Sequence, residues 1–418
     1  MYGKTILPGG LCVLTAAMPH TRSVTISIYV RTGSRYERRE EAGLCHFVEH
    51  LCFKGSRKRP TARAISEAID GIGGILNGGT DRELTVFYAK VAQPHFLLAL
   101  DVLADMLRQP ILDPQEMERE RQVILEELAA VADSPAQQAE LLIDSLLWPD
   151  HPLGWDVAGT EESLKAITRD RIAAFQQQQY TPNNMVVSVA GNIQHEAVVE
   201  AVGHYLGDWP TGTPLSWHPA LDGDNQRRLG LRYKATEQAH LCLAARGLSM
   251  HDPDRYALAL LSIILGEGMS SRLVLELREK RGLAYDVYSY VSHFLDTGAF
   301  TIYAGVAPAK AVEATDIVLQ ELAILDEAKE EELVKAKELA KGRLLLRLED
   351  TRSVSAWMGG QEVLLGRVLT PEQVVANLDA VALSDARRLA RDLLHPRRLY
   401  LAVVGPFRSQ KRFARLLG

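Results

Sequence analysis

Two histidines near the start of the chain have the spacing of a metal-binding pair. The segment His46-Phe47-Val48-Glu49-His50 follows the pattern H-x-x-E-H. If the segment is helical, His46 and His50 lie one turn apart on one face, where two imidazoles can bind one tetrahedral Zn²⁺. Glu49 follows His46 by three residues and lies near the same face, where it can accept a proton from a water at the metal. The pattern therefore predicts a hydrolytic zinc site.

Chance alone rarely produces this pattern. With 12 histidines in 418 residues, an H-x-x-E-H segment is expected in only about a few per cent of chains of this length. The alternative is a helix whose two histidines are merely hydrogen-bonded. A third protein ligand further along the chain distinguishes the two interpretations, because a catalytic zinc site needs three protein ligands and a fourth position for water.

Carboxylates that can supply this ligand follow Asp113-Pro114, which resembles an N-cap and first-turn proline of a helix reaching about Val131. Glu120 and Glu127 are seven residues apart and share a face on which Val123 also lies. A carboxylate on a partly apolar face is costly unless it is paired or bound to metal. For the other carboxylates of this segment, a solvated helix face is the better interpretation; they are Glu116, Glu118 and Glu126.

The composition is that of a globular protein with more than one core. A length of 418 residues favours two domains, and a net charge of −6 gives no reason to expect nucleic acid or an anionic membrane surface as a partner. The four cysteines have no C-x-x-C spacing, which favours buried thiols in a reducing compartment. No run is long and apolar enough for a membrane span, and the first residues do not resemble a signal peptide. We therefore expect a cytoplasmic protein without a membrane partner.

The chain contains an internal duplication. The β-rich segment 83–92 and the helix-like segment 95–107 have counterparts at 299–307 and 311–322, and 183–192 resembles 397–406. Thr85 and Thr301 are 216 residues apart, whereas Asn184 and Arg398 are 214 apart. Two matches at nearly one offset indicate two homologous domains.

The expected domains are residues 1–212, with the metal motif, and 228–418, joined by a linker at Pro210–Arg227. Strands alternate with helices in both, so the predicted fold class is α+β, with one αβ sandwich in each domain. The counterpart of the metal helix is approximately Tyr256–Leu265, which contains no histidine. Chemistry is therefore expected in only one half.

The motifs taken together resemble a known family. His46-Phe47-Val48-Glu49-His50, followed by Glu120-Arg121-Gln122-Val123-Ile124-Leu125-Glu126-Glu127, is similar to the pitrilysin or insulinase superfamily of inverzincins, and most to its branch that resembles mitochondrial processing peptidase. The resemblance covers essentially the whole chain. It implies that His46, His50 and Glu127 bind Zn²⁺, that Glu49 is the general base, and that Glu120 orients the ligands.

The resemblance extends to elements that contact substrate. Residues 73–80 are similar to the family's glycine-rich turn, which implies that Asn77 contacts an extended peptide, although Gly78 stands where relatives often have alanine. A simple tight turn explains the glycines equally well. Residues 277–285 are similar to the family's Arg-x6-Tyr element, which implies that Arg278 and Tyr285 hold the substrate and stabilise the oxyanion. Spacing alone favours a surface arginine and a packed tyrosine.

The implied function is a zinc endopeptidase that acts on unfolded peptides or short polypeptides. Since one chain carries both the zinc motif and the Arg278/Tyr285 element, we expect a homodimer that encloses a chamber, with this element acting in trans. Two alternatives are the catalytic subunit of a heterodimer with a zinc-free homologue and a non-proteolytic structural subunit. The intact metal motif argues against the last.

Overall fold

The computed structural model describes residues 2–221 and 227–417, which form two compact units. Residues 222–226 of the expected linker Pro210–Arg227 lie outside the described residues. Unit 1 consists of Met1–Leu128, Asp156–His218 and Leu345–Thr370, and unit 2 of Ala129–Trp155, Pro219–Leu344 and Pro371–Gly418. Each unit therefore includes a segment from the other half of the sequence.

Unit 1 is built on a six-stranded sheet with the order β1-β2-β6-β3-β5-β4. Strands β2 and β6 are parallel, and the other neighbours are antiparallel. The strands are β1 (Gly3–Ile6), β2 (Cys12–Ala17), β3 (Ser23–Val30), β4 (Ile75–Thr80), β5 (Thr85–Ala92) and β6 (Met185–Gly191). The strand β4 is thus one edge of the sheet, and its outer backbone groups have no neighbouring strand among the described residues.

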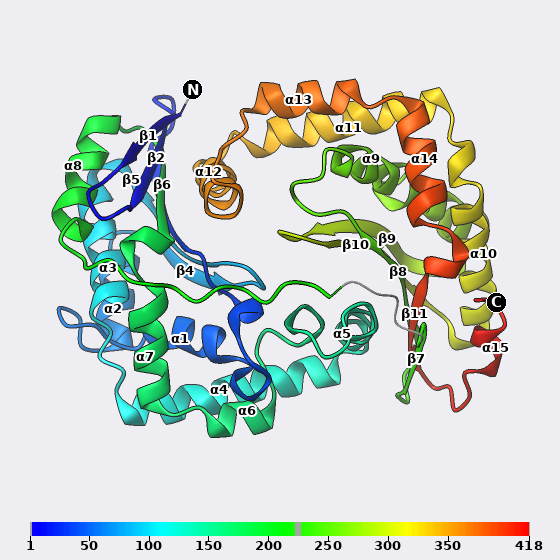
Figure 1. Ribbon diagram of the computed structural model, residues 1–418, viewed down its shortest axis with the longest axis horizontal. Helices are drawn as coiled ribbons and strands as arrows, with labels where there is room; N and C mark the ends of the chain where they lie inside the picture. Colours follow the sequence, from blue (N-terminus) through cyan, green and yellow to red (C-terminus); the bar gives the residue numbers. More distant parts are fainter. Residues whose placement is uncertain (1, 222–226, 418) are drawn as a thin grey trace. The chain divides into compact units, whose positions relative to one another are not determined.

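Helices cover one face of this sheet (Figure 1) and bury the side chains of every second strand residue. In β3, the β-branched residues Val24, Ile26 and Ile28 point into this core, as the alternation of the sequence predicts. The helices are α1 (Leu44–Cys52), α2 (Ala62–Asp70), α3 (Phe96–Arg108), α4 (Pro114–Asp133), α6 (Glu161–Ala166), α7 (Arg169–Gln179) and α8 (His195–Leu206).

Three of these helices begin with a side-chain cap, and the cap at Asp113 is the one predicted from the sequence. The Thr61 hydroxyl accepts a hydrogen bond from the Ala64 amide, and the Thr168 hydroxyl accepts one from the Arg171 amide. Asp113 Oδ1 accepts from the amide of Gln115 at 2.8 Å. Each cap satisfies an amide that has no partner within the helix.

The other face of the first sheet is covered by α12 (Thr351–Leu365), a helix from the second half of the sequence. Ser355 Oγ donates to Ser27 Oγ of β3 at 2.8 Å, and Ser188 Oγ of β6 donates to the Ser355 carbonyl at 2.8 Å. A Cβ on Gly359 would lie 2.3 Å from the Tyr29 ring. Small residues on α12 therefore allow a close approach, and polar strand residues find partners there.

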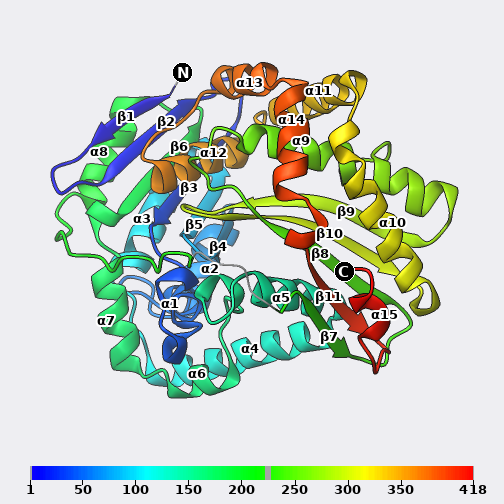
Figure 2. The same cartoon turned by 45° about the vertical axis from the view of Figure 1, so that its right-hand side comes forward.

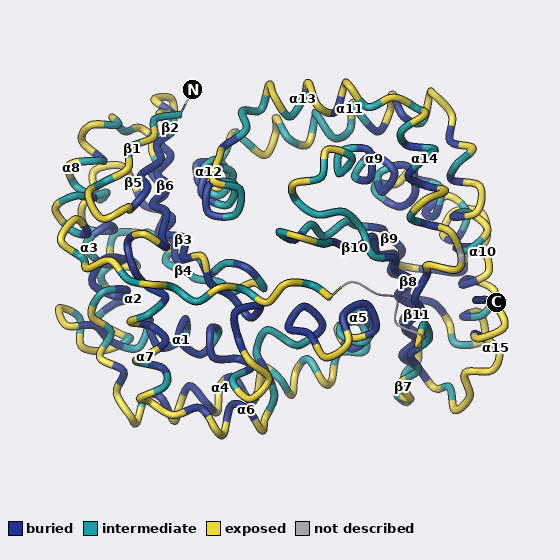
Figure 3. The backbone as a smooth tube through the Cα atoms, viewed as in Figure 1, coloured by how far each residue is buried: buried dark blue, intermediate teal, exposed yellow. Residues whose placement is uncertain are grey.

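Unit 2 is built on a five-stranded sheet with the order β7-β11-β8-β10-β9, which repeats the first sheet without β1. Figures 1 and 2 show it with helices on both faces. The strands are β7 (Leu229–Tyr233), β8 (Ala239–Gly247), β9 (Ala284–His293), β10 (Gly298–Val306) and β11 (Tyr400–Gly405). Central strands of both sheets are buried along their length, whereas most helices keep an exposed side (Figure 3).

One face of the second sheet is covered by helices of the second half, and the other by α5 (Pro135–Leu147) from the first half. The helices on the first of these faces are α9 (Arg255–Gly266), α10 (Ala311–Ala323), α11 (Glu330–Arg347), α13 (Pro371–Ala380), α14 (Leu383–Leu393) and α15 (Lys411–Ala414), with a π-helical segment at Val274–Lys280. Each half of the sequence thus contributes one helix to the sheet of the other half: α5 covers the second sheet and α12 the first.

The structure confirms the predicted α+β class and shows the same strand pattern in both units. Tyr88 and Tyr303, 215 residues apart, both lie on the sheet face that receives the exchanged helix: Arg352 of α12 stacks on Tyr88, and Tyr303 belongs to the cluster that includes α5. The two homologous domains, 1–212 and 228–418, stay a prediction from the sequence repeat. The compact units have other bounds, because each includes a helix from the other half of the sequence. Among the described residues, no helix has the length and apolar character needed to cross a membrane.

Candidate metal centre

The helix α1 carries both histidines, and its sequence fixes which face is buried. Leu44, Phe47, Val48 and Leu51 are at most 1% exposed and pack into the core of unit 1. The remaining face carries His46 and His50, which are half-buried. The hydrophobic periodicity thus turns the two imidazoles away from the core and side by side.

A buried carboxylate and a glycine define the start of α1. Glu37, which is 1% exposed, accepts hydrogen bonds from the amides of Gly43 at 2.9 Å and Cys45 at 2.6 Å. Gly43 has φ 93°, and a Cβ there would lie 2.5 Å from the Ala158 carbonyl oxygen. Only glycine fits this left-handed position without strain. These contacts position the first turn, which carries His46.

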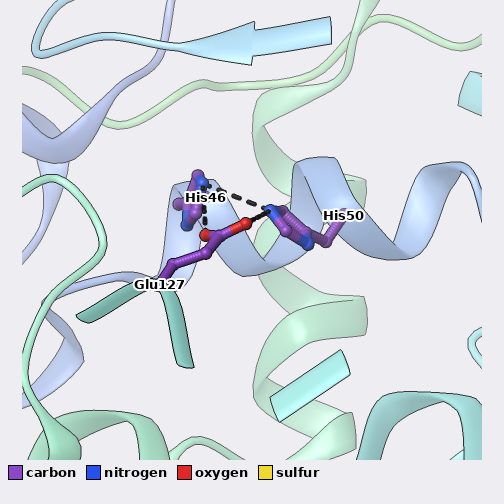
Figure 4. A group of neighbouring side chains, drawn as sticks. All are labelled: His46, His50 and Glu127. Carbon is purple, nitrogen blue, oxygen red and sulfur yellow. Dashed lines mark hydrogen bonds and ion pairs between the residues drawn. The ribbon is translucent and has the colours of Figure 1, made fainter. Parts of the chain in front are cut away.

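Glu127 of α4 completes a three-ligand cluster with the histidines (Figure 4). His46 Nε2 and His50 Nε2 are 3.3 Å apart. Glu127 Oε2 lies 3.7 Å from His46 Nε2, and Glu127 Oε1 lies 3.8 Å from His50 Nε2. Ligand atoms about 2.0 Å from a tetrahedral Zn²⁺ lie about 3.3 Å from one another. The donor set and its spacing therefore fit zinc with only small side-chain adjustments. Among the residues that the structure describes, this is the one group with metal-ligand geometry.

The protonation state of His46 suits a ligand. Burial, followed by the proximity of His50, lowers the pKa of His46 to about 4. The imidazole is thus neutral near pH 7, and a neutral imidazole is the form that binds metal. Its second nitrogen, Nδ1, is buried and has no hydrogen-bonding partner in the described part of the chain. The ring of His46 is therefore held by packing and by the cluster itself.

His50, in contrast, is oriented by a carboxylate. Glu120 Oε2 lies 3.0 Å from His50 Nδ1, and Glu120 is 4% exposed. A hydrogen bond from His50 Nδ1 to this carboxylate directs the Nε2 lone pair toward the cluster, which is the usual arrangement of a metal-bound histidine. The other oxygen, Oε1, forms an ion pair of 2.7 Å with Lys54.

Glu49 lies beside the cluster, between α1 and the edge strand β4. It is 8% exposed, and its Oε2 accepts a hydrogen bond of 2.8 Å from the Thr80 hydroxyl. A Cβ on Gly78 would lie 2.9 Å from Glu49 Oε1. Burial raises the pKa of Glu49, and the hydrogen bond from Thr80 opposes this shift. A carboxylate whose basicity is increased by burial is suited to accept a proton.

The expected substrate residues lie in different units. Asn77 is exposed on β4, and its Oδ1 accepts from the Gly78 amide at 2.8 Å. Arg278 and Tyr285 belong to unit 2, where the guanidinium carbon lies 5.7 Å from the centre of the tyrosine ring. Tyr285 is 79% exposed. The two side chains are thus adjacent, and their substrate role stays a prediction.

Sequence reasoning missed two residues of the site. Lys54 follows His50 by four residues, so helical spacing could have placed it on the same face. Thr80 could not be found in this way, because its contact with Glu49 depends on how β4 packs against α1. The histidines outside the motif belong to no such cluster among the described residues.

Comparison with known proteins places the chain in a family. Residues 12–161 match the model of "Insulinase (Peptidase family M16)", and residues 166–340 match that of the "Peptidase M16 inactive domain". A protein from Streptomyces coelicolor, named an uncharacterized zinc protease, is 39% identical over 98% of this chain and 90% of its own length. Another from Bacillus subtilis, named likewise, is 37% identical over 94% of this chain and 96% of its own.

Solved structures share the fold. A protease from Helicobacter pylori has a TM-score of 0.89 at 22% identity and covers 97% of this chain and 99% of its own. A chain of complex III2 from Candida albicans has a TM-score of 0.87 at 19% identity and covers 99% of both chains. The chain therefore belongs to the insulinase family, peptidase family M16, which confirms the predicted superfamily.

Proposed function

We propose that this chain is a zinc-dependent endopeptidase whose site consists of His46, His50 and Glu127 as ligands and Glu49 as general base. The observation that carries the proposal is the convergence of two imidazoles and one carboxylate, whose donor atoms all lie within 4.8 Å of one another. Zn²⁺ as cofactor and peptide hydrolysis as activity are both supported by the zinc-protease names of relatives that match over nearly the whole chain.

The chain's own residues supply the proton chemistry. When bound, Zn²⁺ polarises the scissile carbonyl and acidifies water. Glu49 then accepts the proton of the attacking water and delivers it to the leaving amine. The Thr80 hydroxyl holds Glu49 Oε2, while Oε1 is the oxygen that faces Gly78. Glu120 orients His50 through Nδ1.

The substrate proposed is an extended, unfolded peptide. The edge strand β4 runs past Glu49 and offers backbone groups that can pair with another strand. Main-chain pairing recognises an extended peptide with little demand on its sequence. Asn77, exposed on this strand, is available to contact the peptide.

Metal analysis combined with a quenched fluorescent peptide assay tests the proposal. We expect about one zinc per chain, cleavage that a chelator abolishes, and restoration of cleavage when zinc is added back. Glu49→Gln should retain the metal and lose the cleavage. A chain that binds zinc but cleaves none of a diverse peptide set would favour the structural-subunit alternative.

We further propose a homodimer that encloses the substrate, in the branch that resembles mitochondrial processing peptidase, with Arg278 and Tyr285 acting in trans and a cytoplasmic location. Mixing Glu49→Gln chains with Tyr285→Phe chains tests the trans arrangement, because mixed dimers should regain one intact site. If the mixture is no more active than either parent, the trans arrangement is wrong. A heterodimer with a zinc-free homologue is the alternative, and it predicts no activity for the purified chain alone.

A further inference from the structure

Lys54 is a charged residue next to the metal centre that the proposed mechanism does not use. It lies just beyond α1, where the Lys54 amide donates to the Leu51 carbonyl at 3.1 Å and continues the helical turn. His46, His50 and Lys54 therefore form a row with a spacing of four residues on one face. The lysine ammonium is 2.7 Å from Glu120 Oε1, and its side chain is 28% exposed.

Glu120 is shared between two partners, one for each carboxylate oxygen. Oε1 is paired with Lys54, and Oε2 lies 3.0 Å from His50 Nδ1. The Glu120 side chain is 5% exposed, so water cannot replace a lost partner easily. Fixing one oxygen of a planar carboxylate also fixes the direction of the other. The Lys54 contact therefore restricts the directions that Oε2, the oxygen facing His50 Nδ1, can take.

We propose that Lys54 is a positioning residue of the zinc site, which acts through Glu120 to orient the imidazole of His50 for metal binding. The inference rests on the zinc site proposed above. It assigns to Lys54 a role in metal affinity and not in contact with substrate. Outer-shell partners of metal-bound histidines typically change metal affinity by about 10–100-fold.

A simple charge effect predicts the opposite sign. Removing a positive charge near a cation site reduces repulsion, so Zn²⁺ should bind more tightly if charge alone matters. Loss of positioning instead leaves Glu120 free to turn, so Zn²⁺ should bind more weakly. The direction of the change in zinc affinity therefore separates the two roles.

The experiment measures the Kd of Zn²⁺ for the full chain by competition with a chromophoric chelator. Lys54→Met keeps most of the side-chain length without the charge, and we expect its Kd to rise about tenfold or more. Lys54→Arg retains the ion pair and should stay within about threefold of the parent. Lys58→Met is the matched control, since Lys58 pairs with Asp101, away from the cluster, and should leave the Kd unchanged.

A double substitution tests whether Lys54 acts through Glu120. In a Glu120→Gln background, Lys54→Met should add less than about twofold, because the carboxylate that it orients is gone. Equal melting temperatures of the zinc-free variants check that the fold is intact, and Co²⁺ absorption spectra report any change of ligand geometry. An unchanged or lower Kd for Lys54→Met, or an equal effect in both backgrounds, overturns the proposal.

Failure of the proposed function gives a different result. Zinc affinity is measured without substrate, so a chain with Lys54-dependent zinc binding and no peptidase activity contradicts only the proposed function. A parent chain that binds no zinc overturns both.

Discussion

The helix α1 on β4 in unit 1 and the helix α9 on β9 in unit 2 occupy equivalent places in two similar sheets. Residues 44–50 and 257–263 have the same succession of burial: two buried, one half-buried, three buried and one half-buried. This alignment places Ala259, Ser262 and Ile263 where the first helix has His46, Glu49 and His50. The scaffold is repeated, and the chemistry is not.

Between α9 and β9 of unit 2, neutral hydroxyl groups lie where unit 1 has the carboxylate of Glu49. Ser262 Oγ lies 3.1 Å from Ser289 Oγ of β9, whereas Glu49 meets the Thr80 hydroxyl of β4. In unit 1 the glycine at the contact between helix and strand is on the strand, whereas in unit 2 it is on the helix. A Cβ on Gly78 of β4 would lie 3.0 Å from the Phe53 ring of the first pair, and in the second pair a Cβ on Gly266 of the helix would lie 2.6 Å from Ser289. Equivalent packing thus needs one small residue, which can be on either element.

The comparison teaches that burial pattern and chemistry are specified separately. Both helices bury the same positions because each packs against a similar sheet. The two half-buried positions, 46 and 50 in α1 and 259 and 263 in α9, can therefore carry either metal ligands or apolar residues. The predictions that follow test how far the two sites differ.

Replacing the carboxylate of the first site should have the largest effect. Glu49→Gln removes the proton acceptor without changing the side-chain volume, and we expect kcat/KM for a quenched peptide to fall about 10³-fold. Ser262→Ala is the matched change in the second site and should leave kcat/KM within about twofold. Comparable losses in both variants would show that the second site participates in the chemistry.

Removing the ligand that lies outside α1 should abolish tight zinc binding. Glu127→Gln weakens one of three ligands, so the Kd of Zn²⁺ should rise by more than about 100-fold, beyond the usual effect of an outer-shell residue. Its neighbour Glu126 is also exposed but belongs to no metal cluster in the described residues. Glu126→Gln should therefore bind zinc like the parent, and an equal loss in both variants would contradict the assignment of Glu127.

The hydroxyl that holds Glu49 should have a smaller effect. Thr80→Val is nearly isosteric and removes the hydrogen bond to Oε2. A hydrogen bond to a charged group contributes about 1.5–3 kcal/mol, so we expect kcat to fall by at least about tenfold while KM changes little. Thr80→Ser restores the donor and should recover most of the activity. If valine and serine behave alike, the hydroxyl is not the cause.

His46 should also make the stability of the zinc-free chain depend on pH. The pKa of His46 is lowered from 6.5 to about 4 by burial. Between these values the unfolded chain binds more protons, so stability should fall as the pH is lowered from about 6.5 to 4, by at most about 3 kcal/mol. Urea midpoints measured in a chelator at several pH values test this. His46→Gln should flatten the dependence, and an unchanged slope would contradict it.

The histidine pair of the proposed zinc site could be predicted from spacing, because His46 and His50 are one turn apart on one helix. Spacing placed Glu120 and Glu127 on one face of a second helix, and only the family resemblance singled out Glu127 as the third ligand. Contacts between distant elements could not be predicted. Thr80 reaches Glu49 only because β4 is the strand beneath α1.

The fold shows the same limit. The alternation in β3 and the cap at Asp113 are local signals, and the structure has a strand and a helix at these places. The repeat was visible, but the offset of 216 residues between Thr85 and Thr301 would pair Phe87 with Tyr303. These two residues lie on opposite faces of their sheets, since Phe87 belongs to the main core of unit 1 and Tyr303 to the cluster with α5. The destinations of α5 and α12 carry no local signal, since both helices have an apolar face that could pack on either sheet.

The reciprocal placement of α5 and α12 has a consequence for synthesis. The strand β3 leaves the ribosome early, yet Thr25 and Ser27 on its second face find Thr351 and Ser355 more than 320 residues later. Contacts of such long range slow folding. In the nascent chain this sheet face therefore stays uncovered until α12 has been translated. The face is mixed, with apolar residues such as Leu14 and Val186 beside the polar Thr25 and Ser27. The polar residues reduce the apolar surface that is exposed during this time, and exposed apolar surface promotes aggregation.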